Sequence, residues 1–277
     1  MQFIDIAQKY LVEDSENLAE LTVKTYRWNL RKIQKFAPNL AIGEISAEFI
    51  RNYRSHLRKA GNGEATIGKA LSVFRIFTNK LIADGLLSQN PFDRIKIHRV
   101  ESRREFLSIR ELKFLYLNFL DRAGALSKGE REALRVFLFS CFTGLRFGDL
   151  QTLNSNEIVD WKIRKRTHKT GEAVYIPIPV QARILIQDVS EGTVFHVADN
   201  AHFNKRLRSG AKKLGCYRHL HCHMARHTFA TTCISIGIPL PVTSKLLGHR
   251  NLETTLIYAK YTDLLLDKEM RKFDRLK

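Results

Sequence analysis

The sequence has no long uncharged apolar run, although a membrane-crossing helix needs about 20 consecutive apolar residues. Its first residues also lack the charged start and the apolar core of a secretion signal. From these two absences we expect neither a membrane anchor nor a cleavable secretion signal. We therefore expect a protein that works in the cytoplasm.

Cysteine is scarce, and its four copies show no paired C-x-x-C spacing. This pattern favours free thiols in a reducing compartment over a disulfide scaffold. One cluster near the C-terminal end could hold a metal, and its members are His219, His221, Cys222, His223 and His227. Structural zinc sites usually combine two separated pairs of ligands. The cluster has no such second pair beside it, so we predict no metal site.

Acidic residues are also few, since 28 Asp and Glu face 46 Lys and Arg. The resulting net charge of +18 calls for a polyanionic partner, and without a membrane segment we expect that partner to be nucleic acid. A hydrophobic content of 44% over 277 residues supports packed cores, and we expect two domains.

The first domain is predicted to be a helical bundle. Residues 1–20 are locally acidic and predict a packing helix, whereas a basic, amphipathic helix should begin at Thr22. Further helices are expected from Ser46 and over residues 64–84, where Gly85 would end the last one. Residues 88–105 contain Pro91 and then a basic run without periodicity, which is typical of a linker. We place the domains at residues 1–100 and 101–277.

The second domain is predicted to be mainly helical with a small antiparallel sheet. Capping boxes begin helices at Ser108 and Ser127, and two strands are expected over residues 158–164 and 173–178. A basic helix over residues 204–214 adds further positive charge. Nine basic residues of the two domains and the linker are the candidates for DNA contacts: Lys24, Arg27, Arg31, Lys69, Arg75, Arg103, Arg104, Lys205 and Arg206.

The C-terminal part carries residues that suit phosphate chemistry. His223 and Arg226 lie three positions apart, so one helix would place both on one face. Gly248 should end the next helix with His249 just beyond it, and Tyr258 follows nine residues later. A phenol oxygen beside cations can attack a phosphodiester and form a covalent phosphotyrosyl bond.

Four short motifs resemble those of the tyrosine recombinases, the phage integrase family. They are TGLR around Arg146, HMARHTFAT around Arg226, LLGHR around His249 and TTLIYAKY around Tyr258. The resemblance implies a site-specific recombinase that cleaves and rejoins DNA through a 3′-phosphotyrosyl intermediate, in integration, excision or inversion. It also implies a two-domain clamp on DNA, in which a SAM-like core-binding domain precedes the catalytic domain.

The resemblance carries over a catalytic set of six residues: Arg146, Lys169, His223, Arg226, His249 and Tyr258. It gives Tyr258 the role of nucleophile, the two arginines that of phosphate ligands, and Lys169 that of proton donor to the leaving 5′ oxygen. It also makes an acidic residue, Asp149, a candidate for orienting one of the cations. No cofactor is needed, because the phosphotyrosine keeps the energy of the broken bond.

Spacing alone leaves alternatives open for three of these roles. His227 lies one helical turn from His223, and only the family pattern prefers His223 and makes His227 a packed residue. Tyr261 lies three positions after Tyr258, and Lys165 lies four before Lys169. A non-catalytic DNA-binding protein also remains open, since residues 240–259 can be read as two helices joined by a turn. A type IB topoisomerase is a third candidate, which the LGH motif disfavours.

The family resemblance also implies the partners. Double-stranded DNA is the substrate, a homotetramer acts on two DNA sites, and accessory DNA-bending proteins are compatible with it. Larger phage integrases have an arm-binding domain, for which there is no room before Thr22, so we expect simple sites and an Xer-like size. The apolar tail over residues 262–277 would dock either in a neighbouring subunit or on its own domain. The expected setting is the bacterial cytoplasm, in association with the nucleoid.

Overall fold

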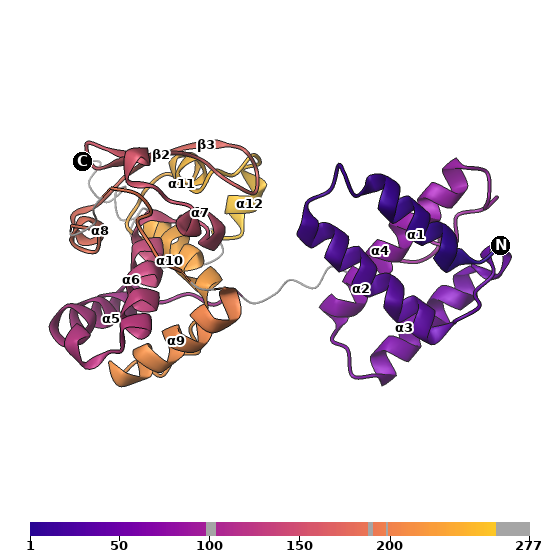
Figure 1. Cartoon of the computed structure of the whole chain (residues 1–277), viewed down its shortest axis with the longest axis horizontal. Coiled ribbons are helices and arrows are strands. Elements are labelled where there is room, and N and C mark those ends of the chain that lie inside the picture. Colours follow the sequence, from indigo (N-terminus) through magenta and orange to yellow (C-terminus); the bar gives the residue numbers. More distant parts are fainter. Residues whose placement is uncertain (98–103, 188–190, 198, 259–277) are drawn as a thin grey trace, which may run out of the picture. The chain divides into compact units, whose positions relative to one another are not determined.

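The computed structural model describes residues 1–97, 104–187, 191–197 and 199–258. The chain divides into two compact units, Met1–Ser102 and Arg103–Lys277, and each has hydrophobic core clusters of its own. The first unit is helical, and the second combines helices with a small sheet (Figure 1). This is the mainly α fold with a small antiparallel sheet that the sequence predicts. Over the described ranges, no helix has the length and apolarity needed to cross a bilayer.

Over residues 1–97, the described part of the first unit, four α-helices bring their apolar faces together in one core. They are α1 (Phe3–Asp14), α2 (Glu20–Phe36), α3 (Ala47–Lys59) and α4 (Glu64–Ala83), with a 3₁₀ turn η1 (Ile42–Glu44) between α2 and α3. The ring of Phe74 on α4 lies at the centre. It makes edge-to-face contacts with the rings of Phe3, Phe49, Tyr53 and Phe92. Such pairs add to the stabilisation that apolar burial provides.

Several predicted boundaries of this unit are confirmed. Ser46 caps α3, because its hydroxyl accepts a hydrogen bond from the amide of Phe49 at 3.1 Å. Gly85 follows α4 with a φ of 70°, a left-handed conformation that favours glycine. The acidic α1 is a packing helix, as expected. Asp14 at its end accepts hydrogen bonds from the ammonium of Lys80 at 2.6 Å.

Two predictions for this unit are wrong in position. The basic helix begins at Glu20 with Ala19 as its N-cap, because the amide of Thr22 already donates to the Ala19 carbonyl. The predicted linker also begins too early in the sequence. Phe92 and Ile95 are buried in the core of the first unit, so the chain leaves that core only after them.

The second unit is built around helix α6. Its elements are α5 (Ile109–Arg122), η2 (Ala123–Ala125), α6 (Lys128–Thr143), α7 (Phe147–Gln151), η3 (Ser155–Glu157), β1 (Ile158–Val159), β2 (Lys162–Arg166), β3 (Ala173–Pro177), α8 (Val180–Ile184), α9 (Asn200–Lys213), α10 (Cys222–Ser235), α11 (Leu240–Leu247) and α12 (Glu253–Leu256). Helix α6 packs against both α9 and α10, and most of its side chains from Ala133 to Thr143 are buried. Both predicted capping boxes are confirmed, at Ser108 for α5 and at Ser127 for α6.

The sheet has three antiparallel strands in the order β1-β2-β3. The expected strand over residues 158–164 is wrong, because Asp160 and Trp161 adopt φ values of 50° and 59° and turn the chain between β1 and β2. Two consecutive positive φ values are typical of a two-residue hairpin turn. Pro177 lies on the edge strand β3, paired with Lys162, as expected of a residue without an amide donor.

The predicted end of α11 is confirmed, and two helices joined by a turn, α11 and α12, lie within residues 240–259 as expected. Gly248 ends α11 with a φ of 59°, and His249 follows it. Among the described residues, α12 spans only Glu253–Leu256, and Tyr258 just after it is 2% exposed. A recognition helix instead presents a long exposed face to the major groove.

We predict that Gly144→Ala lowers the free energy of unfolding by about 2–4 kcal/mol. Gly144 ends α6 with a φ of 71°, and an added Cβ would overlap the ring of Phe229. Chemical denaturation measures the change.

Gly148→Ala is the matched control. Gly148 lies within α7, and a Cβ added there meets no atom within 4 Å. This variant should be as stable as the wild type, or more stable by up to about 1 kcal/mol. Equal losses in the two variants would contradict the prediction.

Candidate active site

Helix α10 carries three of the polar residues that surround the candidate site. His221 caps it, since its Nδ1 accepts from the amide of Met224 at 3.3 Å. His223, Arg226 and His227 then follow on the helix, as predicted for the first two. Most of the helix from Met224 to Ile234 is buried, whereas His223 in its first turn and Ser235 at its end are exposed.

Arg226 is almost completely buried, at 4% exposure, and it joins the ends of two other helices. Its Nη1 donates to the carbonyl of Gly144 at the end of α6 at 2.7 Å, and its Nη2 donates to the carbonyl of Leu247 at the end of α11 at 2.5 Å. Burial, and then the charge of Arg146, lower its pKa to about 9, which still leaves it charged at neutral pH. The TGLR and LGH motifs therefore meet on this guanidinium.

Arg146 lies at the N-cap of α7, directly after the turn at Gly144 and Leu145. Its Nη1 is buried and has no hydrogen-bond partner among the described residues. Its charge lowers the pKa of Arg226, so the two guanidiniums repel one another across a short distance. Two like charges, and a buried donor without a partner among the described residues, are features that suit the binding of an anion.

His249 lies beyond the end of α11 and is half-buried. Its Nδ1 and the hydroxyl oxygen of the buried Thr255 are 2.7 Å apart, which leaves the opposite ring nitrogen for another partner. Burial, and then the charges of Arg226 and Arg146, lower the pKa of His249 to about 4. The ring is therefore neutral at physiological pH.

Tyr258 is buried, and its hydroxyl oxygen lies 2.7 Å from Nδ1 of His227. The guanidinium of Arg104 lies 5.9 Å from the centre of the Tyr258 ring. Burial raises the pKa of the phenol, whereas the charges of Arg104, Arg226 and Arg146 lower it. The pKa of Tyr258 is raised overall, and the cations offset part of the effect of burial.

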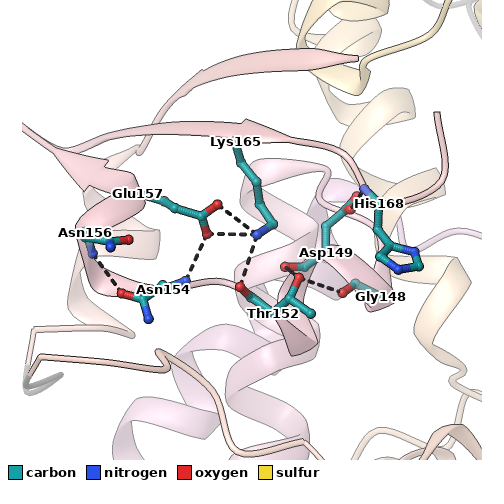
Figure 2. Close-up of polar contacts among 8 residues, drawn as sticks. All are labelled: Gly148, Asp149, Thr152, Asn154, Asn156, Glu157, Lys165 and His168. Atoms are coloured by element: carbon teal, nitrogen blue, oxygen red, sulfur yellow. Dashed lines mark hydrogen bonds and ion pairs between the residues drawn. The ribbon is translucent and has the colours of Figure 1, made fainter. Parts of the chain in front are cut away.

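The hairpin between β2 and β3 carries Lys169, which is exposed (residues 167–172). Figure 2 shows how the base of this hairpin is held. Asp149 of α7 is buried, and its Oδ1 accepts from the amide of His168 at 2.7 Å. Asp149 therefore fixes the backbone next to Lys169. The sequence predicted that Asp149 orients a cation of the site, and it did not predict this contact with a backbone amide.

Lys165, the alternative to Lys169, is held in another set of contacts (Figure 2). Its Nζ donates to both carboxylate oxygens of Glu157 at 2.9 and 2.8 Å and to the carbonyl of Thr152 at 3.1 Å. Its side chain is only 7% exposed. Lys165 thus ties β2 to the segment after α7, and its three donors are engaged there.

The charge of Lys169 affects the pKa of His223 on α10. Burial lowers the pKa of the His223 imidazole, and four nearby cationic groups lower it further: Arg226, His221, Arg104 and Lys169. All six candidate residues thus take part in one set of electrostatic interactions, with Lys169 at its exposed rim. Sequence reasoning missed the contact between His227 and Tyr258, which lie 31 positions apart, because no spacing rule connects them.

The candidate DNA contacts are placed as follows. Lys24, Arg27 and Arg31 are exposed on α2, Lys69 and Arg75 are exposed on α4, and Lys205 and Arg206 are exposed on α9. Lys24 pairs with Glu20 at 2.6 Å, and Arg206 lies across Gly129 at the start of α6. Arg104 is half-buried beside Tyr258, while Arg103 lies outside the described residues, as do Tyr261 and the tail.

The described residues contain no cluster of three or more His, Cys, Asp or Glu side chains that could hold a metal ion. The four cysteines are free thiols, of which Cys141, Cys216 and Cys233 are buried. Burial raises the pKa of the Cys141 thiol well above its usual value, so it is an inert core residue.

We predict that Arg226→Lys lowers the free energy of unfolding by about 2–4 kcal/mol. A lysine ammonium on a single stem cannot reach the carbonyls of both Gly144 and Leu247, so at least one buried acceptor loses its partner. Arg146→Lys is the control, because Nη1 of Arg146 has no partner to lose among the described residues. Thermal or urea unfolding of both variants measures the difference, and a larger loss in Arg146→Lys would refute it.

Comparison with known proteins identifies the family of the chain. Residues 116–264 match the Phage integrase family, and residues 2–98 match the Phage integrase SAM-like domain. A tyrosine recombinase of Thermosipho africanus is 26% identical over 94% of this chain and 93% of its own length. Tyrosine recombinase XerC of Bacillus subtilis is 25% identical over 95% of this chain and 93% of its own length.

Solved structures share the fold at low sequence identity. A lambda integrase dimer bound to a COC′ core site matches 92% of this chain and 75% of its own with a TM-score of 0.75 and 18% identity. The Tn1549 transposon integrase in complex with transposon right end DNA matches 100% of this chain and 99% of its own with a TM-score of 0.76 and 16% identity. The family match spans more than half of the chain and includes Arg146, Arg226, His249 and Tyr258. The chain belongs to the phage integrase family, the tyrosine recombinases.

Proposed function

We propose that this protein is a site-specific DNA recombinase that cleaves and rejoins DNA strands through a 3′-phosphotyrosyl intermediate. One observation carries the proposal: the buried phenol of Tyr258 lies near Arg104, Arg226 and Arg146, whose charges offset part of the rise in its pKa that burial causes, and Nη1 of Arg146 is buried without a partner among the described residues. A phosphodiester is the anion that such a phenol can attack.

Arg146 and Arg226 would bind the two non-bridging oxygens of the phosphate. Each Nη of a guanidinium carries two hydrogens, and Arg226 uses its Nη1 and Nη2 toward the two helix-end carbonyls. The second hydrogen of each nitrogen and the Nε hydrogen remain for the phosphate. A guanidinium already fixed by the protein loses little freedom when it binds, so it stabilises the transition state efficiently.

The reaction would begin when the Tyr258 oxygen attacks phosphorus. The P–O5′ bond then breaks, and Lys169 gives a proton to the leaving 5′ oxygen. His249 and His223 would donate to the phosphate oxygens as charge develops on them. Rejoining reverses these steps with a new 5′ hydroxyl. Because the protein–DNA ester keeps the bond energy, the reaction requires neither nucleotide nor metal.

The two units would form a clamp around double-stranded DNA. The match of residues 2–98 to the SAM-like domain supports a core-binding role for residues 1–100, followed by a catalytic domain over residues 101–277. Arg27 and Arg31 lie on the exposed face of α2, and Lys205 and Arg206 lie on α9, where all four can contact phosphates. Arg104 would act closer to the chemistry, beside Tyr258.

A homotetramer on two DNA sites is the assembly we propose. Its support is indirect: a lambda integrase tetramer bound to a Holliday junction matches 92% of this chain with a TM-score of 0.74. Accessory DNA-bending proteins fit such an assembly as partners. We place the activity on nucleoid DNA in the bacterial cytoplasm, since the curated relatives are bacterial.

Covalent capture tests the function. DNA with a nick a few nucleotides to the 3′ side of the target phosphate releases the short fragment that carries the new 5′ hydroxyl, so the protein–DNA adduct cannot be rejoined, accumulates and resists denaturant. Tyr258→Phe should abolish this adduct, with duplex affinity unchanged within about threefold, because only the nucleophile is removed. Gel electrophoresis after denaturation measures the adduct. Persistence of the adduct in Tyr258→Phe would refute the assignment, and binding without any wild-type adduct would favour a non-catalytic DNA-binding protein.

The role of Lys169 has its own test. Lys169→Ala should slow cleavage by about 10²- to 10⁴-fold, because the 5′ oxygen then leaves without a proton donor. Sulfur in place of that oxygen should restore the rate, since thiols ionise near pH ~8.5 and leave unaided.

Lys165→Ala is the matched control. Loss of its bonds to Glu157 and Thr152 should lower the free energy of unfolding by about 1–2 kcal/mol, with no selective rescue by sulfur. Rescue of Lys165→Ala in place of Lys169→Ala would exchange the roles of the two lysines.

A further inference from the structure

We propose that His227 is the base that takes the proton from the Tyr258 hydroxyl during strand cleavage. This inference rests on the proposed recombinase function and deepens it. The family pattern selects His223 as the working histidine of α10. In this chain, however, the imidazole in contact with the nucleophile is that of His227, whose Nδ1 lies 2.7 Å from the phenol oxygen.

The position of His227 on α10 explains the contact. It lies one turn after His223, on the side of the helix that is turned inward, and it is 5% exposed. Its ring centre lies 5.6 Å from that of Tyr258 and 4.4 Å from that of His223. The imidazole of His227 therefore contacts both other rings, while His223 is exposed at the surface end of the turn.

The surrounding protein holds the pair of rings in place. Tyr258 packs in a small core with Phe229, Leu247 and other apolar side chains from α10 and α11. The guanidinium of Arg104 lies 5.9 Å from the centre of the Tyr258 ring, and its hydrogen bond to the phenol lowers the pKa of Tyr258. A base that is fixed within hydrogen-bond distance before the reaction meets the geometric requirement for general base catalysis.

Burial and the neighbouring cationic groups together keep the imidazole of His227 neutral. Burial lowers the pKa of His227 to about 3, and the cationic groups that face it act in the same direction: His223, His221 and Arg226 of α10 and its cap, and Arg104 of the segment before α5. A neutral ring with its hydrogen on Nε2 has a free lone pair on Nδ1, to which the phenol can donate. A phosphodiester bound by Arg146 and Arg226 brings negative charge, which favours the imidazolium and raises this pKa when the proton must be accepted.

The complete step then balances as follows. The Tyr258 oxygen forms a bond to phosphorus while its proton moves to Nδ1 of His227, and the P–O5′ bond breaks while Lys169 gives a proton to the 5′ oxygen. During rejoining, His227 returns its proton to the departing phenolate oxygen. His223, at the exposed end of the same turn, is free to donate to the phosphate.

The test measures the rate of adduct formation on nicked DNA whose scissile 5′ oxygen is replaced by sulfur, so that proton donation by Lys169 no longer contributes. The variants are His227→Gln, which keeps a hydrogen-bonding side chain but cannot carry the proton, and His227→Phe. His223→Gln, one turn away on the same helix, is the matched control. DNA affinity and melting temperature are measured for all three.

The wild-type rate should change little between pH 7 and pH 9, because neutral His227 is present throughout. Both His227 variants should be slower by about 10²- to 10⁴-fold at pH 7, and their rate should rise about tenfold per pH unit, since the phenol must then ionise unaided. His223→Gln should keep the flat profile and lose rate and phosphate affinity together.

Three results would overturn the proposal. The first is a His227→Gln rate within about threefold of wild type, with a flat pH profile. The second is the steep profile in His223→Gln only, which would return the base to His223. A fall in melting temperature with an unchanged pH profile would make His227 a packing residue and also refute it. Failure of the function itself is distinguishable, because wild-type protein would then form no adduct.

Discussion

The guanidinium of Arg226 is the interaction on which the candidate site depends. It is buried, and it donates to the carbonyl of Gly144 at the end of α6 and to that of Leu247 at the end of α11. Two positions after each of these carbonyls lies a candidate phosphate ligand. Arg146 follows Gly144, and His249 follows Leu247. One side chain thus sets the spacing between three separate motifs.

The charge distribution of the site is unfavourable without an anion. Arg226 and Arg146 repel one another, and their field lowers the pKa of His249 to about 4, after the effect of burial. Such repulsion costs stability in the free protein, and a bound phosphate removes it. The same field acts on the buried phenol of Tyr258, whose ionisation burial alone would oppose. The site is therefore most stable when it holds the group on which it acts.

Much of this arrangement could be predicted from the sequence, because helix ends have local rules. Capping residues located α5 and α6, and glycine located the turns before Arg146 and His249. Contacts between distant segments have no such rule. Two features of the sheet depend on how the hairpin packs. One is the ion pair of Lys165 with Glu157, and the other is the turn at Asp160 that interrupts the predicted first strand. For the same reason, spacing made His227 and His223 equivalent, although only the packing of α12 brings Tyr258 to His227.

Peptide mapping of the covalent protein–DNA complex tests the central claim most directly, namely that Tyr258 is the residue joined to DNA. Trypsin cuts after Arg250 and Lys260, so Tyr258 and Tyr261 fall on different peptides, residues 251–260 and one that begins at 261. Mass spectrometry after nuclease digestion should find the nucleotide on the peptide that contains Tyr258. A nucleotide on the peptide that contains Tyr261, or on any other, would contradict this account.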